Sequence, residues 1–185
     1  MTIKVNFGCG EEKPEGWVNV DLDFAFKPDL QVDLSKDLPF ASASVDYILS
    51  EDFISQLDIE GSKRFLRECR RILKPRGVMR LLTPDLQKLA RAYLDRPDWL
   101  LGIWKTHVGV PLATGTACEV VNLGIRLSGQ FFYDAPTFIQ VASECGLRAE
   151  VVEYNQSAYA ELRGLDLRRP DESVSMYFEC HPHQA

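Results

Sequence analysis

The 185-residue sequence lacks the features that mark membrane proteins and nucleic-acid-binding proteins. No apolar run approaches the length of a membrane span, and the N-terminus has no charged segment followed by an apolar one. The 27 Asp and Glu outnumber the 21 Lys and Arg, and the formal net charge of -6 leaves no excess of positive charge for nucleic acid or anionic lipid. We therefore expect a cytoplasmic protein with no membrane span and no nucleic-acid partner.

Cysteine is scarce and lacks the spacing of a metal or disulfide site. The five cysteines are odd in number, widely spread and without a Cys-x-x-Cys pair, which favours reduced thiols. Only the C-terminal segment ECHPHQA brings Cys180 close to His181 and His183. We interpret this segment as a frayed tail and expect no metal site, because ligands on a mobile end lack supporting contacts.

Strand and helix patterns alternate along the chain, which we expect to form one domain over residues 1–185. Five strands and three helices are predicted: strands at 3–7, 17–20, 30–34, 45–50 and 78–83, helices at 60–75, 84–94 and 134–146. In the second helix we expect Pro84 in the first turn, and in the third Asp134 as N-cap and Gly146 as C-terminal stop.

Two further segments complete this pattern. Residues 96–133 show little periodicity and are interpreted as an irregular insertion with short helices. Residues 147–155 and 173–181 alternate like two antiparallel strands on either side of a polar, Arg-rich loop. The order of elements predicts an α/β fold with a three-layer sheet.

Glycines and acids follow the first four predicted strands. In chain order these groups are Gly8-Cys9-Gly10, Asp21, Asp33-Leu34 and Ser50-Glu51. Ligands of open parallel sheets bind at the carboxyl ends of the strands, where glycine allows close approach and an acid accepts hydrogen bonds from ribose hydroxyls or an amine. We expect no basic residue near the rim formed by these strand ends to hold phosphates, so the implied ligand is a nucleoside with a cationic or zwitterionic tail. Each group alone is also typical of an ordinary turn or a solvated strand end.

The segments VNFGCGEEKPEGWVNVDLD, VDLSKDLPFASASVDYILSEDF and FLRECRRILKPRGVMRLLTPDLQKLARAYL together resemble the class I S-adenosylmethionine-dependent methyltransferases. Within this family they look most like a small group of predicted bacterial methyltransferases with a shortened first crossover. The resemblance implies a Rossmann-like sheet of strand order 3-2-1-4-5-7-6, with the last strand antiparallel. Relatives often carry a Glu-His pair where this chain reads EDFISQL, so an orienting group is absent here or the acceptor differs.

The resemblance also implies how S-adenosylmethionine is bound, with S-adenosylhomocysteine as product. Its methionine part would lie on the loop of Gly8, Cys9 and Gly10. The ribose hydroxyls would bind Asp21. The remaining roles fall to two pairs: Asp33 and the Leu34 N–H would face the adenine, and Ser50 and Glu51 would line the pocket behind the sulfonium.

The first crossover is too short for a helix, since only Glu11–Gly16 separate the Gly-Cys-Gly loop from the next strand. Retracing a five-residue strand takes about 17 Å plus about 5 Å sideways, and the nine residues from Gly8 to Gly16 span about 30 Å when extended. The connection is therefore possible with the first helix reduced or absent. We expect it to leave an apolar patch on one sheet face. We expect the 96–133 insertion, or a second copy of the chain in a homodimer, to pack on this patch or over the pocket.

Methyl transfer needs positioning, and a base only if the acceptor must lose a proton. The candidates for a base are His107 and Tyr133, with Asp85 below His107, although core packing is the simpler interpretation of the aromatic residues in the insertion. We expect a small-molecule or glycan-type acceptor. A non-catalytic S-adenosylmethionine-binding protein is the alternative, whereas a nicotinamide or flavin dehydrogenase is disfavoured because the third glycine and the phosphate-binding helix N-terminus are missing.

Overall fold

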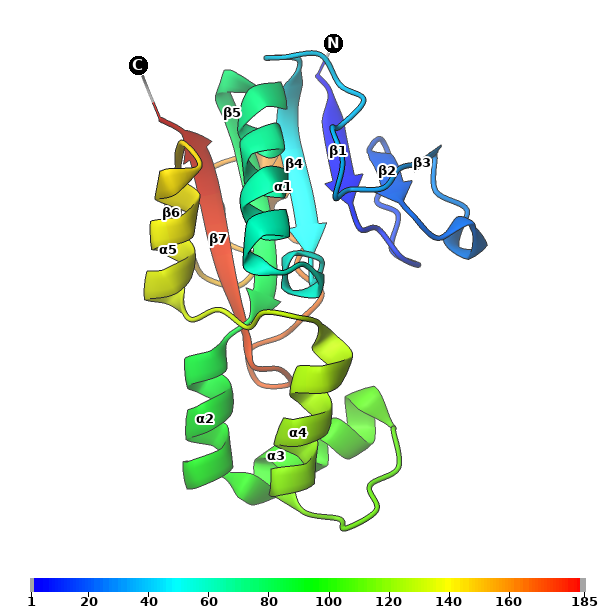
Figure 1. Cartoon of the computed structure of the whole chain (residues 1–185), viewed down its shortest axis with the longest axis vertical. Coiled ribbons are helices and arrows are strands. Elements are labelled where there is room, and N and C mark those ends of the chain that lie inside the picture. Colours follow the sequence, from blue (N-terminus) through cyan, green and yellow to red (C-terminus); the bar gives the residue numbers. More distant parts are fainter. Residues whose placement is uncertain (1, 184–185) are drawn as a thin grey trace.

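The strands of the computed structural model, which describes residues 2–183, form one seven-stranded sheet of order β3-β2-β1-β4-β5-β7-β6 (Figure 1). The strands are β1 Lys4–Phe7, β2 Val18–Asp21, β3 Leu30–Gln31, β4 Val45–Glu51, β5 Leu73–Pro84, β6 Leu147–Val151 and β7 Ser175–Pro182. Only β7 runs antiparallel to both of its neighbours. The predicted order and the antiparallel last strand are confirmed.

Two helices cover one face of this sheet. They are α1 Ile59–Ile72 and α5 Ala135–Glu144, and Figure 1 shows both in front of the strands. The N-cap carboxylates of Asp58 and Asp134 accept hydrogen bonds from the backbone N–H groups of Gly61 and Thr137. The main core lies between these helices and the sheet, where side chains such as Phe65 and Phe178 are fully buried.

The β1–β2 connection contains no helix in any of its residues, all of which the structure describes. Gly8 and Gly16 turn the chain with φ of 67° and 77°, in the left-handed region that favours glycine. A Cβ on Gly8 would also lie 2.8 Å from the Cβ of Phe53. The predicted loss of the first helix is therefore confirmed, and the β2–β3 connection has only a short 3-10 turn at Phe24–Phe26.

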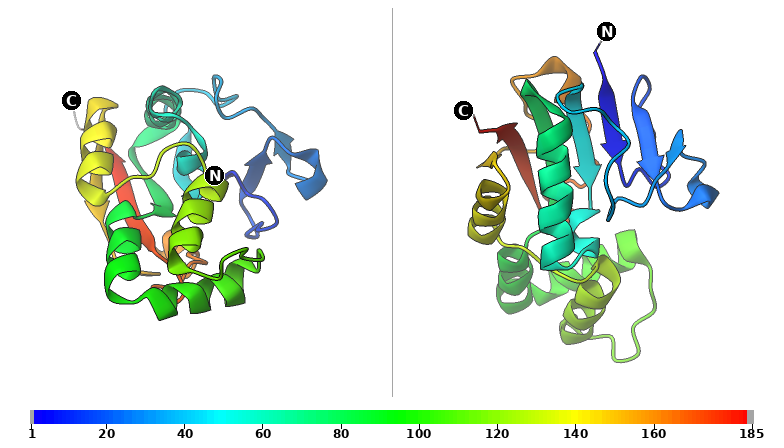
Figure 2. Two further views of the ribbon diagram at one scale, coloured as in Figure 1. Left: turned by 60° about the horizontal axis from the view of Figure 1, so that its bottom comes forward. Right: turned by 45° about the horizontal axis from the view of Figure 1, so that its top comes forward.

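The β6–β7 connection, residues 152–174, covers the second face of the sheet. This differs from the prediction that the insertion packs there. Its side chains Tyr159, Leu162 and Leu165 pack with Leu49 and Tyr177 of the sheet in a second apolar cluster. Figure 2 shows this connection behind the strands, on the side opposite α1. The expectation that the insertion covers this face was wrong, because this chain's own connection does so. The homodimer stays a prediction.

Over β1 and β2 this face carries polar side chains, so the expected apolar patch is absent from these described strands. Asn6 and Asn19 are buried there, and the Asn6 amide donates hydrogen bonds to Glu12 O and to Asn19 Oδ1. Asn19 in turn donates to Asp29 Oδ2 at 3.0 Å. These bonds satisfy polar groups that a packed helix would otherwise have to cover.

Arg80 of β5 anchors the connection to the sheet. Its guanidinium is fully buried, forms an ion pair with Asp166 and lies 3.5 Å from Glu179 Oε1. It also donates to the carbonyl oxygens of Gln156 and Glu153 at 3.0 and 2.9 Å. The buried guanidinium of Arg80 thus bonds three residues of a connection that has little regular structure.

The insertion forms a helical layer at the carboxyl ends of the parallel strands (Figure 1). It packs with α2 Leu86–Asp95 and consists of α3 Pro97–Ile103, a π-helical turn at Trp104–Val108 and α4 Ala117–Ser128. The 12-residue α4 corrects the prediction of irregular structure and short helices only. Thr116 is the N-cap of α4, and Glu119 follows three residues later, which is a capping signature in the sequence independent of apolar periodicity.

Two further predictions are corrected. Pro84 ends β5, and the helix that follows is capped by Asp85, whose Oδ1 accepts from Gln87 N and Lys88 N. The supposed frayed tail belongs to the sheet up to Pro182, because Cys180 and its neighbours pair with both β5 and β6. Within residues 2–183 the helices are all too short or too polar to cross a membrane.

Candidate active site

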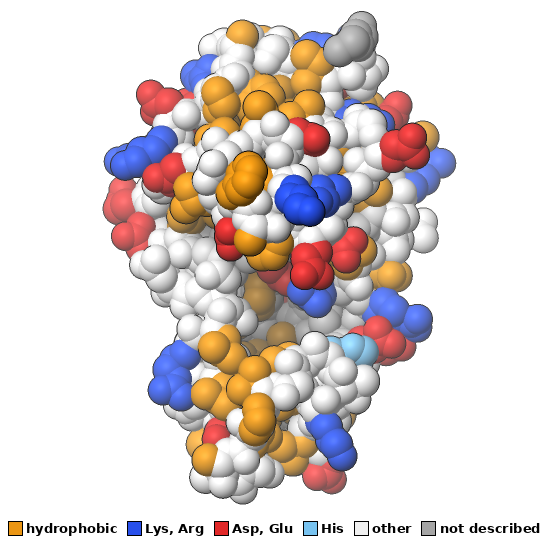
Figure 3. Space-filling view, turned by 90° about the vertical axis from the view of Figure 1, so that its right-hand side faces the viewer, with side chains coloured by type: hydrophobic (Ala, Val, Ile, Leu, Met, Phe, Trp, Pro, Cys, Tyr) orange, Lys and Arg blue, Asp and Glu red, His pale blue; other side chains and the backbone are white. Residues whose placement is uncertain are grey.

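Three cavities meet the rim formed by the carboxyl ends of β1, β2 and β4. The loop cavity, of about 470 Å³, lies between residues 8–14 and residues 164–168 of the β6–β7 connection. The edge pocket, of about 170 Å³, lies beyond Gly8 beside β2 and β3. The roofed cavity, of about 450 Å³, lies between this rim and the helical insertion. Figure 3 shows the molecule hollowed between its sheet part and its helical part.

The Gly8-Cys9-Gly10 loop is held open toward the loop cavity. Gly8 N and Cys9 N both donate to Val20 O, at 2.9 and 3.1 Å, which fastens the loop to β2. Gly10 has a φ of 51°, and a Cβ built on it would meet no atom within 4 Å. Its N–H donates to Asp21 Oδ2 at 2.9 Å, so the loop and the acid that follows β2 are fixed to each other.

The edge pocket combines carboxylates with apolar side chains. Asp21, Asp33 and Leu34 line it as their positions in the sequence predict. Four lining residues were not predicted: Ser35, Phe53, Leu57 and Leu22, which is 59% exposed. Hydrogen bonds from the Ser35 hydroxyl and N–H lower the pKa of Asp33, which keeps its carboxylate ionised.

The end of β4 presents two carboxyl groups to the loop cavity, those of Glu51 and Asp52. Burial, aided by the negative charge of Asp52, raises the pKa of Glu51 to about 7. Burial also raises the pKa of Asp52, while Arg168 opposes that rise. Glu51 Oε1 and Asp52 Oδ1 are buried without a hydrogen-bond partner among the described residues. Ser50, by contrast, is fully buried on β4 and lines none of the three cavities described above.

Arg168 brings a positive charge to a rim for which the sequence predicted no basic residue. It comes from the β6–β7 connection, and its Nε lies 2.9 Å from Asp52 Oδ2 and 3.5 Å from Glu51 Oε1. Lys13 also lines the loop cavity. The prediction failed because Arg168 is 116 residues from Asp52 in the sequence. With two carboxylates beside it, Arg168 does not turn the rim into a phosphate site.

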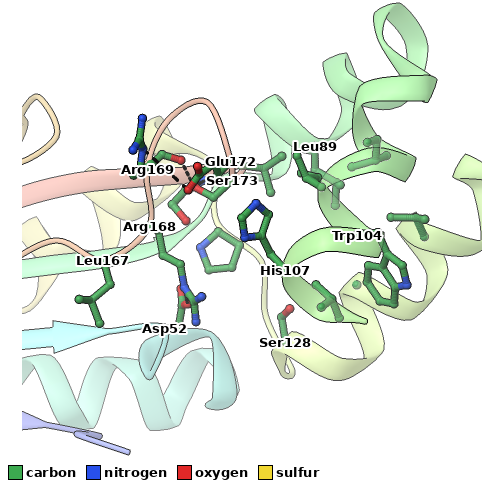
Figure 4. Close-up of a pocket in the computed structure, with 18 of the residues that line it drawn as sticks. Asp52, Leu89, Trp104, His107, Ser128, Leu167, Arg168, Arg169, Glu172 and Ser173 are labelled. Carbon is green, nitrogen blue, oxygen red and sulfur yellow. Dashed lines mark hydrogen bonds and ion pairs between the residues drawn. The ribbon is translucent and has the colours of Figure 1, made fainter. Parts of the chain in front are cut away.

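The roofed cavity has an apolar roof and a charged floor (Figure 4). The insertion supplies Leu100, Trp104, Val120 and Phe132. Asp52, Arg168, Arg169 and Glu172 line the side of the sheet and the connection. Asp52, Leu167 and Arg168 line both this cavity and the loop cavity, so the two are neighbours at these residues.

The structure separates the two residues predicted as candidate bases. His107, from the π-helical turn, lines the roofed cavity, and its ring lies on the side of the helical roof in Figure 4. Tyr133 is fully buried in the main core against Phe131 and Phe138 and is not in the lining of the three cavities. Asp85 is engaged as the N-cap of α2.

Comparison with known proteins finds one matching family model and many solved structures with a similar fold. Residues 7–81 match the family model described as a methyltransferase domain. No curated protein matches the sequence.

Similar solved structures include an S-adenosylmethionine-dependent methyltransferase from Mesorhizobium loti, with 18% identity, a TM-score of 0.58 and coverage of 97% of this chain and 90% of that one. A chain of the complex between the Haloferax volcanii Trm112 methyltransferase activator and the putative methyltransferase has 13% identity and a TM-score of 0.57, covering 100% of this chain and 83% of that one.

LepI in complex with SAM, that is S-adenosylmethionine, also has a TM-score of 0.57, with 9% identity, but this chain spans only 43% of it. At these identities the solved structures establish the fold, and the family model adds the sequence match over β1 to β5. The match over residues 7–81, which is less than half of the chain, and the shared fold together support a class I S-adenosylmethionine-dependent methyltransferase.

Proposed function

We propose that the chain binds S-adenosylmethionine across the edge pocket and the loop cavity and methylates a small acceptor in the roofed cavity. One observation carries this proposal: a cavity beside the glycine loop and a cavity under the helical roof share the lining residues Asp52, Leu167 and Arg168. Donor and acceptor held in these two cavities would face each other at the shared residues, as an in-line displacement requires.

The described residues fit the donor part by part. Asp21 keeps lone pairs free for the ribose hydroxyls, and the edge pocket offers Asp33 with apolar side chains such as Phe53 to an adenine. The open face at Gly10 leaves room for the methionine part. Glu51 Oε1, which accepts no hydrogen bond from the described residues, suits its ammonium group. Ser50 we assign to packing beneath the rim.

S-adenosylmethionine, when bound, supplies an already activated methyl group, so this chain's residues mainly bind, orient and exclude water. The acceptor would lie under the apolar side chains of Trp104 and Phe132. If it must lose a proton, His107 is the predicted base that lines its cavity. We do not assign this role to Tyr133, since its ring is enclosed in the core.

The roofed cavity supports an acceptor with a compact apolar body more than a glycan. Its volume of about 450 Å³ suits one small molecule, and its roof offers mostly aliphatic and aromatic side chains rather than the many hydrogen-bonding groups that sugar hydroxyls need. An O–H or N–H group on that body would point toward Asp52 and Arg168.

Thermal shift with three ligands tests donor binding. S-adenosylmethionine and S-adenosylhomocysteine should raise the Tm, and NAD should leave it unchanged. In D21N the affinity for S-adenosylhomocysteine should fall about tenfold, because a charged hydrogen bond to the ribose is lost. D23N is the matched control, since Asp23 lies two residues away and lines none of the three cavities. Equal effects of the two substitutions would contradict the assignment.

Release of S-adenosylhomocysteine separates an enzyme from a non-catalytic binding protein. The chain is incubated with S-adenosylmethionine and fractions of a small-molecule extract, and product is measured in each. An enzyme forms product with at least one fraction and none without it. Binding with no product in any fraction would favour the non-catalytic alternative.

A further inference from the structure

Asp52 occupies an unusual position at the end of β4. Its φ of 53° lies in the left-handed region, which is uncommon for a residue other than glycine and concentrates at functional sites. The conformation is fixed by a hydrogen bond from Asp52 N to Leu82 O at 3.0 Å. This turn directs the side chain to the boundary shared by the loop cavity and the roofed cavity, where Figure 4 shows it beside Arg168.

The boundary places two carboxyl groups beside one guanidinium. Arg168 Nε bonds Asp52 Oδ2 at 2.9 Å and lies 3.5 Å from Glu51 Oε1, so one guanidinium serves two carboxyl groups. Asp52 Oδ1 is buried without a hydrogen-bond partner in the described part of the chain. A buried carboxylate oxygen without a partner is costly unless a ligand completes it, which makes this boundary suited to a cation.

We propose that Asp52 recognises the positive charge of the donor's sulfonium and makes the site prefer S-adenosylmethionine to S-adenosylhomocysteine. The inference rests on the proposed function, because the methyl group can reach an acceptor in the roofed cavity only if the sulfur lies near the residues that the two cavities share. In the transfer the C–S bond breaks, its electron pair stays on sulfur, and the methyl carbon bonds the acceptor. The attraction to Asp52 then disappears, which favours release of the product.

Glu51 provides the contrast that makes this inference specific. It lines the loop cavity but not the roofed cavity. A carboxylate there would meet the ammonium group of the methionine part, which donor and product both carry. Loss of the Glu51 charge should therefore weaken both ligands alike, whereas loss of the Asp52 charge should weaken only the donor.

Isothermal titration calorimetry of both ligands tests this pair of expectations. D52N should cut the preference for S-adenosylmethionine over S-adenosylhomocysteine about tenfold while the affinity for the product changes less than about twofold. E51Q should weaken both ligands by a similar factor. E172Q, which removes another carboxylate that lines the roofed cavity but not the loop cavity, should change neither.

A second substitution at Asp52 distinguishes loss of its charge from misfolding of one variant. Asn tolerates the left-handed conformation and Gly adopts it without strain, so D52N and D52G should both fold and give the same loss of preference. An unchanged preference in both variants, or an equal loss for donor and product, overturns the role of Asp52 while the proposed function stands. Absence of binding by the wild-type chain overturns the proposed function itself.

Discussion

The two faces of the sheet are covered in different ways. On one face α1 and α5 bury apolar side chains such as Phe65 and Phe138. On the other, residues 152–174 have almost no regular structure and are fixed by the buried charge of Arg80 together with a smaller apolar cluster. The difference teaches that a sheet face need not be covered by helices if one polar anchor holds an irregular segment in place. Of these two covering segments, only the β6–β7 connection lines the loop cavity, with Leu167 and Arg168 among its lining residues.

Replacement of Arg80 by leucine should have the largest effect. The change leaves Asp166 and Glu179 buried without their cation, which should cost about 3–5 kcal/mol in the free energy of unfolding. It should also weaken S-adenosylhomocysteine binding, because the connection that lines the loop cavity loses its anchor. Urea unfolding and calorimetry measure the two effects, and Arg76→Leu in an exposed part of β5 is the control.

Replacement of Phe65 by alanine tests the helical face in the same way. A fully buried phenylalanine truncated in a core costs about 3–5 kcal/mol. Ligand affinity, measured at a temperature where the variant is still folded, should change little because Phe65 lines none of the three cavities described above. If Phe65→Ala weakened binding as much as Arg80→Leu, the two faces would not differ in the way proposed.

The pH dependence of Glu51 gives a somewhat smaller effect. Its pKa rises from the ordinary 4.5 to about 7 on folding, so the native state holds this proton more tightly than the unfolded state does. The contribution to stability is therefore full below pH 4.5 and is lost as the pH rises through 7, by an amount on the order of 3 kcal/mol. The free energy of unfolding of E51Q relative to wild type should rise across this interval, without ligand. A constant difference from pH 4 to 8 would show that Glu51 ionises normally.

The smallest effect is expected from the caps on the helical face. Asp134 Oδ1 accepts from Thr137 N at 2.9 Å at the start of α5. Asp134→Ala should cost about 1 kcal/mol and lower the Tm by about 2–4 °C. Asp134→Asn, which keeps an oxygen acceptor, should recover most of the loss, and neither variant should alter ligand affinity.

Much of the fold could be predicted because its signals are local. Alternating apolar residues marked β1, β2 and β4, and the charged caps marked α5. The strand predicted at 30–34 is only Leu30–Gln31 in the structure, because its partner β2 ends at Asp21. Helix α4 was missed because Gly124 and its β-branched neighbours weaken the helical pattern.

The apolar patch need not have been expected. Lys4 and Asn6 already alternate with Val5 and Phe7 in the printed sequence, a pattern typical of a strand with only one apolar face. At the site, the glycine loop and its acids followed from strand order. The contact of Arg168 with Asp52 did not, since it depends on a long connection crossing the sheet and no local pattern specifies where such a segment lies.

The position of β7 has a consequence for how the chain is made. It is the last strand to be synthesised, yet it lies between β5 and β6 and bonds to both. Until residues 175–182 emerge, one side of β5 and the whole of β6 lack a strand to pair with, and unpaired strand edges of this kind invite association with other chains. The growing polypeptide is thus most exposed to aggregation just before β7 closes the sheet.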